Sequence, residues 1–140
     1  MSQPVFHHSY RVIYADCTLG NHVYYGRYLN LLEAARGAFF RELGLSFDTL
    51  QVRSVIFPVI ECRLRYQAPA RYDDELSIAV WPFAIARVRL NLAYRITNAA
   101  NKTVLEGETF HVCSNLKDKP IRLPADLVAK LTPWLARPPE

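Results

Sequence analysis

The spacing of hydrophobic residues changes along this chain and predicts a strand followed by one long helix. Residues 8–15 are rich in β-branched and aromatic side chains, which is typical of a strand. Residues 24–43 instead repeat apolar side chains at helical spacing. The apolar positions are Tyr28, Leu31, Leu32, Ala35, Phe39 and Leu43, and Leu29 and Phe40 widen this stripe to more than half of the circumference. We therefore expect a helix that is mostly surrounded by the rest of the protein.

After this helix the period shortens to two, which predicts strands. Gly44 suits the left-handed position that ends a helix, and residues 46–51 predict a short further turn. Strands are expected at 56–66, 76–83, 88–97 and 103–114, and a short closing helix within 123–135, stopped near Pro133. In the first of these strands Ile60, Cys62, Leu64 and Tyr66 alternate with Glu61, Arg63 and Arg65, which predicts one buried face.

This order of elements predicts an α+β protein. Consecutive strands joined by short loops favour an antiparallel sheet. The long apolar helix needs a surface to pack on, and the sheet is the only large one available. We expect a single domain over residues 1–140, with a curled sheet of about five strands around one central helix.

Composition and charge exclude several other classes. The chain has 17 Lys and Arg against 13 Asp and Glu, and these basic residues are scattered, so a nucleic-acid partner is not expected. Three cysteines without a CxxC pair argue against a disulfide framework and a cysteine zinc site, and we expect no metal. No leader pattern and no apolar run of membrane-spanning length is present, so a cytoplasmic location is expected.

One segment between the first strand and the helix gathers candidate chemistry. Asp16 is the only acid there, and His22, Tyr24 and Tyr25 follow it. By residue type alone, Asp16 is expected to cap a turn. His22 could position substrate or water, or could hydrogen-bond the loop. The two tyrosines could line a pocket or fill the core.

Three motifs in this sequence resemble those of a known family. Asp16, His22, Val23 and Tyr28 fit the pattern D-x5-H-V-x4-Y, and LNLLEAAR follows at the family's spacing. YQAPARYDDEL at 66–76 and KPIRLPADL at 119–127 resemble two further family segments. Together they resemble the hotdog-fold acyl-CoA thioesterases of the 4-hydroxybenzoyl-CoA thioesterase branch. The chain departs from the pattern at Thr18 and Asn21, where many relatives have an acid and a glycine. One branch of the family has a histidine at the position of Tyr25, and another has Asn-Asn in place of Tyr24-Tyr25.

The resemblance implies hydrolysis of the thioester of an acyl-CoA or an acyl carrier protein. Asp16 would be the nucleophile or the general base, and N–H groups near Tyr24 and Tyr25 at the helix start would hold the oxyanion. Tyr28 would contact substrate. No cofactor is implied, because coenzyme A is part of the substrate. A homodimer or homotetramer with the active site between protomers is expected, since a single curled sheet exposes its edges.

Several alternatives stay open on sequence alone. Glu33 on the helix could be the catalyst instead, as in some hotdog thioesterases, or could pair with Arg36 three residues later. Cys17 is expected to be a small buried apolar residue rather than a nucleophile. Four basic residues could meet the phosphates of coenzyme A or be solvated surface charges: Arg87, Arg89, Lys119 and Arg122. A hotdog dehydratase or a non-catalytic acyl-binding module is the alternative function.

Overall fold

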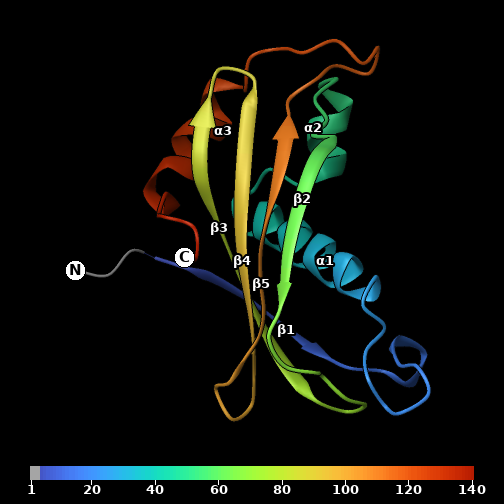
Figure 1. Cartoon of the computed structure of the whole chain (residues 1–140). Helices are drawn as coiled ribbons and strands as arrows, with labels where there is room; N and C mark the ends of the chain where they lie inside the picture. Colours follow the sequence, from blue (N-terminus) through green and yellow to red (C-terminus); the bar gives the residue numbers. More distant parts are fainter. Residues whose placement is uncertain (1–3) are drawn as a thin grey trace.

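The computed structural model describes residues 4–140 and has the predicted order of elements. A first strand and a short 3-10 turn precede the long helix, and four strands and a short helix follow (Figure 1). The bounds are β1 Phe6–Arg11, η1 Tyr14–Asp16, α1 Arg27–Glu42, α2 Phe47–Val52, β2 Val59–Tyr66, β3 Glu75–Ala86, β4 Arg89–Asn98, β5 Thr103–Val112, α3 Ala125–Leu131 and η2 Thr132–Trp134.

The five strands form one antiparallel sheet in the order β1-β3-β4-β5-β2. The sheet curls, and α1 lies in its concave side (Figure 1). This arrangement confirms the predicted curled sheet around one central helix. Among residues 4–140, no helix combines the length and the apolar character that crossing a membrane requires.

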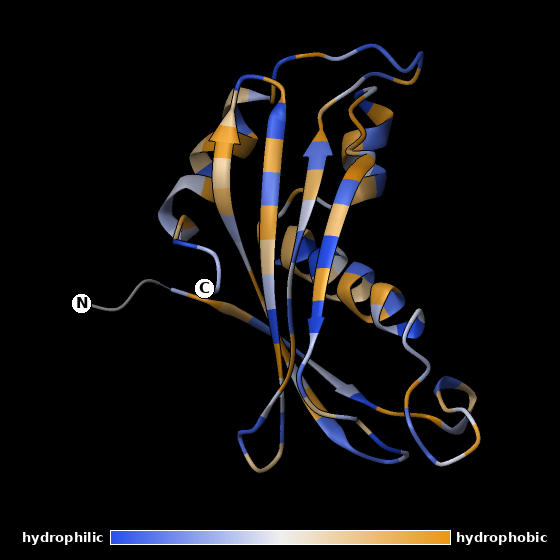
Figure 2. Ribbon diagram, viewed as in Figure 1, coloured by the Kyte–Doolittle hydropathy of each residue, from blue (hydrophilic) through white to orange (hydrophobic). Residues whose placement is uncertain are grey.

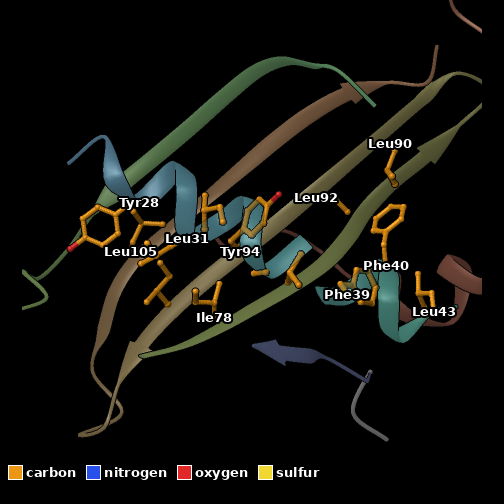
Figure 3. Close-up of a cluster of buried hydrophobic side chains, with 14 of the residues drawn as sticks. Tyr28, Leu31, Phe39, Phe40, Leu43, Ile78, Leu90, Leu92, Tyr94 and Leu105 are labelled. Atoms are coloured by element: carbon orange, nitrogen blue, oxygen red, sulfur yellow. The ribbon is translucent and has the colours of Figure 1, made fainter. Parts of the chain in front are cut away.

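The core lies between α1 and the concave face of the sheet. Leu31, Leu32, Ala35 and Phe39 of the helix are buried, and Figure 3 shows Ile78, Leu90, Leu92 and Tyr94 of the sheet pointing toward it. Alternate residues of each strand form the inner face of the sheet, and residues three or four apart form the apolar face of the helix. The core is made where these two faces meet. Each fully buried Leu or Phe contributes roughly 1.5–3 kcal/mol relative to exposure.

The end of the first strand and the start of the helix differ from the sequence prediction. β1 ends at Arg11, not near residue 15, because Ile13 to Asp16 form a tight turn in which the Asp16 side chain accepts the Ile13 N–H. The helix begins at Arg27 rather than at residue 24, because Tyr24 takes part in a separate turn and its carbonyl accepts the Arg27 N–H. Both shifts lie in the segment that contains the candidate chemistry.

β2 has the predicted alternation but not the predicted burial. Ile60 is 52% exposed and Tyr66 49% exposed, and Cys62 is also exposed. Figure 2 shows hydrophobic and hydrophilic residues alternating along this strand. β2 is an edge strand of the sheet, and no segment within residues 4–140 covers its inner side fully. Leu29 of α1 is likewise 42% exposed, so the expectation of a mostly surrounded helix is wrong at this position.

Candidate active site

Asp16 is a buried carboxylate held by three donors. Its residue is only 1% exposed. The Tyr10 hydroxyl donates to Oδ2 at 2.7 Å, and the Ile13 N–H donates to the same oxygen at 2.9 Å. The Arg27 Nε–H donates to Oδ1 at 2.7 Å. Tyr10 comes from β1 and Arg27 is the first residue of α1, so this carboxylate joins the strand to the helix start.

These contacts keep Asp16 ionised. Burial by itself would raise the pKa of the Asp16 carboxyl, but the hydrogen bonds from Tyr10, Arg27 and the Ile13 N–H outweigh it, and the pKa lies below its ordinary value. Burial, and the hydrogen bond to Asp16, raise the pKa of Tyr10 to about 12. At neutral pH the pair is therefore a carboxylate and a neutral hydroxyl donor.

The main-chain N–H groups before α1 differ in availability. The Tyr24 N–H donates to the main-chain carbonyl of Asp16 at 2.8 Å, so it is not free to hold an oxyanion, contrary to the sequence expectation. For Tyr25 and Gly26, no residue between 4 and 140 accepts the main-chain N–H. An oxyanion role would therefore fall to these two groups, at the positive end of the helix dipole.

A cavity of about 390 Å³ lies beside this segment and brings together three of the predicted residues. His22, Tyr25 and Tyr28 line it, with Tyr66 of β2. The Tyr66 hydroxyl donates to the Tyr25 carbonyl at 2.9 Å. Tyr28 is buried, whereas Tyr25 is 66% exposed and does not fill the core. Asp16 does not line this cavity. It is joined to the loop beside the cavity by the hydrogen bond from the Tyr24 N–H to its main-chain carbonyl.

Tyr24 itself is half exposed, and its ring packs at a tilt against that of Tyr25 rather than on the core. The rings of Tyr24 and Tyr25 lie 4.8 Å apart. Both tyrosines are thus surface residues of the loop in the single chain.

Glu33 and Arg36 lie near each other but form a loose pair. Their closest charged atoms are 3.9 Å apart, with the Glu33 side chain 70% exposed and that of Arg36 only 14% exposed. Both line a second and larger cavity, and Asp16 does not line that one either.

The four predicted phosphate-binding residues lie at the opposite end of the sheet from Asp16. Arg87 and Arg89 flank the β3–β4 turn, and the turn binds the segment after β5, since the Leu123 N–H donates to the Arg87 carbonyl at 2.8 Å. Lys119 and Arg122 belong to that segment and are exposed. Figure 1 shows the turn and this segment at the top, and the loop before α1 at the lower right. One chain alone does not bring these cations to Asp16.

Cys17 and Cys113 are poor candidates for nucleophiles. Burial, with Asp16 and Asp74 nearby, raises the pKa of Cys17. Burial raises the pKa of Cys113 to about 11. Cys17 is half-buried and contacts the core, in agreement with its expected apolar role. Within residues 4–140, no group of three or more His, Cys, Asp and Glu side chains is placed to share a metal ion.

Sequence reasoning missed Tyr10 and Arg27, the two side chains that hold Asp16. A signal existed for each. Tyr10 belongs to the alternate residues of the first strand that face inward. Arg27 lies at the start of the helix, close to where an ionised acid would cap that helix. The pairing itself depends on how the loop folds back, which residue spacing does not reveal.

The sequence matches the family described as the thioesterase-like superfamily over residues 12–131. It is 35% identical over 131 residues to the acyl-CoA thioester hydrolase YbgC of Escherichia coli O6:H1, covering 93% of this chain and 98% of the relative. It is 27% identical over 128 residues to a 1,4-dihydroxy-2-naphthoyl-CoA hydrolase of Synechococcus elongatus, covering 89% and 91%. The structure superposes with a TM-score of 0.82 on a probable thioesterase from Bartonella henselae, at 25% identity, covering 86% of this chain and 100% of that one.

Fold and matches together define the class as a hotdog-fold thioesterase. The chain belongs to the thioesterase-like superfamily.

Proposed function

We propose that the protein hydrolyses acyl-CoA thioesters, with Asp16 acting on the thioester carbonyl or on water. The observation that carries this proposal is the buried, ionised Asp16 beside the start of α1. Direct attack by the carboxylate would expel the thiolate and give a mixed anhydride, which water would then hydrolyse to the free acid and Asp16. With Asp16 as base, water would give up a proton to the carboxylate and add to the carbonyl carbon; the thiolate would then leave and take up that proton, giving the free acid and the thiol. The relatives named as acyl-CoA and naphthoyl-CoA hydrolases support the choice of coenzyme A as carrier.

The hydrogen bonds of Asp16 favour water activation over direct attack. A carboxylate offers about four lone-pair sites, and three donors already use three of them. Oδ2 accepts two hydrogen bonds and Oδ1 accepts one, so one lone pair of Oδ1 is unused. The side chain is 0% exposed, so this lone pair would accept from a water molecule only if the neighbouring loop moved to admit one. Direct attack would instead require the carboxylate to leave Arg27.

The site would be completed by a second copy of the chain. The inner side of β2 is apolar and exposed, and its end at Tyr66 contacts the active-site loop at Tyr25. Its beginning lies near the basic segment, because Ile56 bridges Ser114 and Ser114 bridges Pro120. If β2 pairs antiparallel with β2 of a partner, the partner's basic segment comes beside this chain's loop. Phosphates of coenzyme A could then meet cations from across the interface.

A panel of acyl-CoAs tests the function, with thiol release as the readout. We expect kcat/KM to rise from acetyl to medium-length chains, because each buried methylene contributes roughly 0.8 kcal/mol until the pocket is full. Aromatic acyl groups are also expected to be accepted, given the tyrosines at the loop. A higher kcat/KM for acetyl-CoA than for octanoyl-CoA would contradict the expected acyl preference.

The same panel separates the alternatives. Hydration of an enoyl-CoA without thiol release would identify a dehydratase. Binding of acyl-CoA with no turnover of any kind would identify an acyl-binding module. Assays with acyl carrier protein in place of coenzyme A would show which carrier is used.

A further inference from the structure

The larger of the two cavities described lies along α1 and has an apolar wall. It measures about 600 Å³ and lies between α1, α2 with the segment that follows it, and the sheet. Its apolar wall is made by Phe40, Phe47, Val55, Phe57, Leu90 and Leu92. Figure 3 shows Phe40, Leu90 and Leu92 projecting into the space between helix and sheet. The volume is in the range of cavities that take small organic ligands.

The helix sequence connects this cavity to Asp16. Arg27, which holds Asp16, begins a stripe of alternating three- and four-residue steps, so its members share one side of the helix. Asn30, Ala34 and Gly37 continue this stripe and line the cavity. Ala34 and Gly37 are small, which leaves room beside the helix. The cavity therefore starts about one turn, ~5 Å, beyond the residue that holds the candidate catalytic carboxylate.

Arg36 is the donor that this cavity offers to a ligand. Its side chain is 14% exposed, so its guanidinium is largely removed from water. Its carboxylate neighbour Glu33 is 3.9 Å away and mostly in solvent, which is too long for a charge-assisted hydrogen bond. A guanidinium has five N–H donors, so the nearby Tyr94 hydroxyl and the loose Glu33 pair leave donors of this largely buried cation for a better-placed carboxylate.

The other buried polar groups at this wall are already satisfied. His111 Nδ1 lies 3.0 Å from the Phe57 carbonyl, which only accepts, so Nδ1 carries the hydrogen. His111 Nε2 must then accept from the Thr109 hydroxyl at 2.8 Å, and Thr109 accepts from the Tyr94 hydroxyl at 2.7 Å. This chain of hydrogen bonds leaves neither ring nitrogen of His111 for a ligand.

The charges that face the cavity favour an anion. Arg36 and Arg41 line it against Glu33 as the one acid. Two histidines also line it. Burial lowers the pKa of both, with Arg41 contributing at His8 and Arg36 at His111. Both are neutral at pH 7, so the lining has one net positive charge.

We infer that this cavity holds the acyl group, and that Arg36 binds a carboxylate at the far end of the acyl chain. The preferred substrates would then be coenzyme A thioesters of dicarboxylic acids. The apolar wall would hold the methylenes, and the guanidinium would donate two parallel hydrogen bonds to the terminal carboxylate. This inference rests on the proposed thioesterase function and names its substrate class.

The test compares two acyl-CoAs of equal chain length, octanoyl-CoA and its counterpart with a terminal carboxylate, suberyl-CoA. We expect the wild-type protein to have the higher kcat/KM on suberyl-CoA. Arg36→Met should lower the suberyl-to-octanoyl ratio at least about tenfold, because it removes both hydrogen bonds to the charged carboxylate and the loss of one alone has about that effect. Arg53→Met is the matched control, because Arg53 pairs with Asp126 on the surface and does not line the cavity. Its ratio should not change.

Two further variants guard against misfolding of Arg36→Met, since Arg36 lies near the buried Tyr94 hydroxyl. Arg36→Lys keeps the charge but not the planar fork, and should give an intermediate ratio. Glu33→Gln removes the competing carboxylate, and should raise the ratio.

A wild-type preference for octanoyl-CoA would overturn the inference, as would a ratio unchanged in Arg36→Met. An equal rise of KM for both esters would also overturn it, because Arg36 would then bind the coenzyme A part.

Binding of the free acids separates this inference from the proposed function. Calorimetric titration needs no catalysis, and we expect suberate to bind more tightly than octanoate, with the difference lost in Arg36→Met. If suberate binds in this way but no thioester is hydrolysed, the proposed function fails and the cavity assignment stands. If thioesters are hydrolysed but octanoate binds as tightly as suberate, the function stands and the cavity assignment fails.

Discussion

Replacing Asp16 by asparagine tests the residue on which the proposed chemistry depends. The variant removes both the nucleophile and the base, and positioned acid–base groups typically contribute about 10²–10⁴-fold, so kcat should fall by at least that order. The structure adds a second effect. An asparagine NH₂ would face the Arg27 or Tyr10 donors, so we also expect a loss of about 1–3 kcal/mol of stability. Steady-state kinetics and urea unfolding measure the two effects separately.

Two controls make this result specific. Asp126→Asn changes another aspartate that is paired with an arginine, but on the surface, and should leave kcat near normal. Glu33→Gln tests the rival assignment. Loss of activity in Glu33→Gln with retention in Asp16→Asn would transfer the catalytic role to the helix glutamate.

Arg27 is expected to set the pH at which Asp16 becomes active. Its hydrogen bond is among the contacts that lower the pKa of the Asp16 carboxyl, so removing it should raise that pKa. In Arg27→Gln the acid limb of the kcat/KM profile should therefore move to higher pH. Arg53→Gln, which breaks the exposed pair with Asp126, should leave the limb in place. An unmoved limb in Arg27→Gln would mean that Asp16 does not control the profile.

At the scale of elements, His111 joins β5 to the segment before β2 and should make the fold sensitive to acid. Burial is the main reason that the pKa of His111 falls to about 4, with the Phe57 carbonyl opposing the shift and Arg36 adding to it. Between about pH 6.5 and pH 4 the unfolded chain binds a proton that the native protein does not. The contribution of neutral His111 to the free energy of unfolding is therefore fully present above about pH 6.5. It is lost as the pH falls through this window, by about 2 kcal/mol between pH 7 and pH 5.

Urea unfolding at the two pH values measures this loss. In His111→Gln the difference between pH 7 and pH 5 should shrink, even if the variant is less stable at both. An equal difference in the wild-type and variant proteins would show that other groups cause the acid sensitivity. His8, whose pKa burial also lowers, is the first of these to test.

At the scale of the whole molecule, we expect a homodimer joined through β2, or a tetramer made of two such dimers. β1 is the other edge, but its inward residues Phe6 and Tyr10 already pack on the core, whereas Ile60 and Tyr66 of β2 remain about half exposed. Ile60→Lys places a charge on the apolar side of the paired edge, and should give a monomer with reduced kcat/KM. Val52→Lys is the matched control, because Val52 is 88% exposed on α2.

Light scattering at micromolar concentration is the measurement. A monomeric wild-type protein would contradict the proposal. So would a dimer that persists in Ile60→Lys, because pairing would then use another surface.

Local patterns in the sequence determined the class of fold and the candidate carboxylate. Period-two and helical spacing are properties of neighbouring residues, so they predict the strands, α1 and the two faces that meet in the core. The motif around Asp16 and His22 is similarly local, and its resemblance to thioesterases agrees with the family match over residues 12–131. Element boundaries near the active-site loop were less accurate, because turn hydrogen bonds there decide where β1 stops and α1 starts.

Only the tertiary structure decided which groups act on one another. Tyr10 and Arg27 reach Asp16 because the loop folds back between β1 and α1, and the same fold uses up the Tyr24 N–H. Arg36 and the His111 hydrogen-bond chain meet one cavity although they come from distant parts of the sequence. β2 keeps the alternation of a buried strand, but its exposure depends on its place at the sheet edge. Burial and contact depend on which segments pack together although they are far apart in the sequence. Residue spacing within one segment carries no information about that packing.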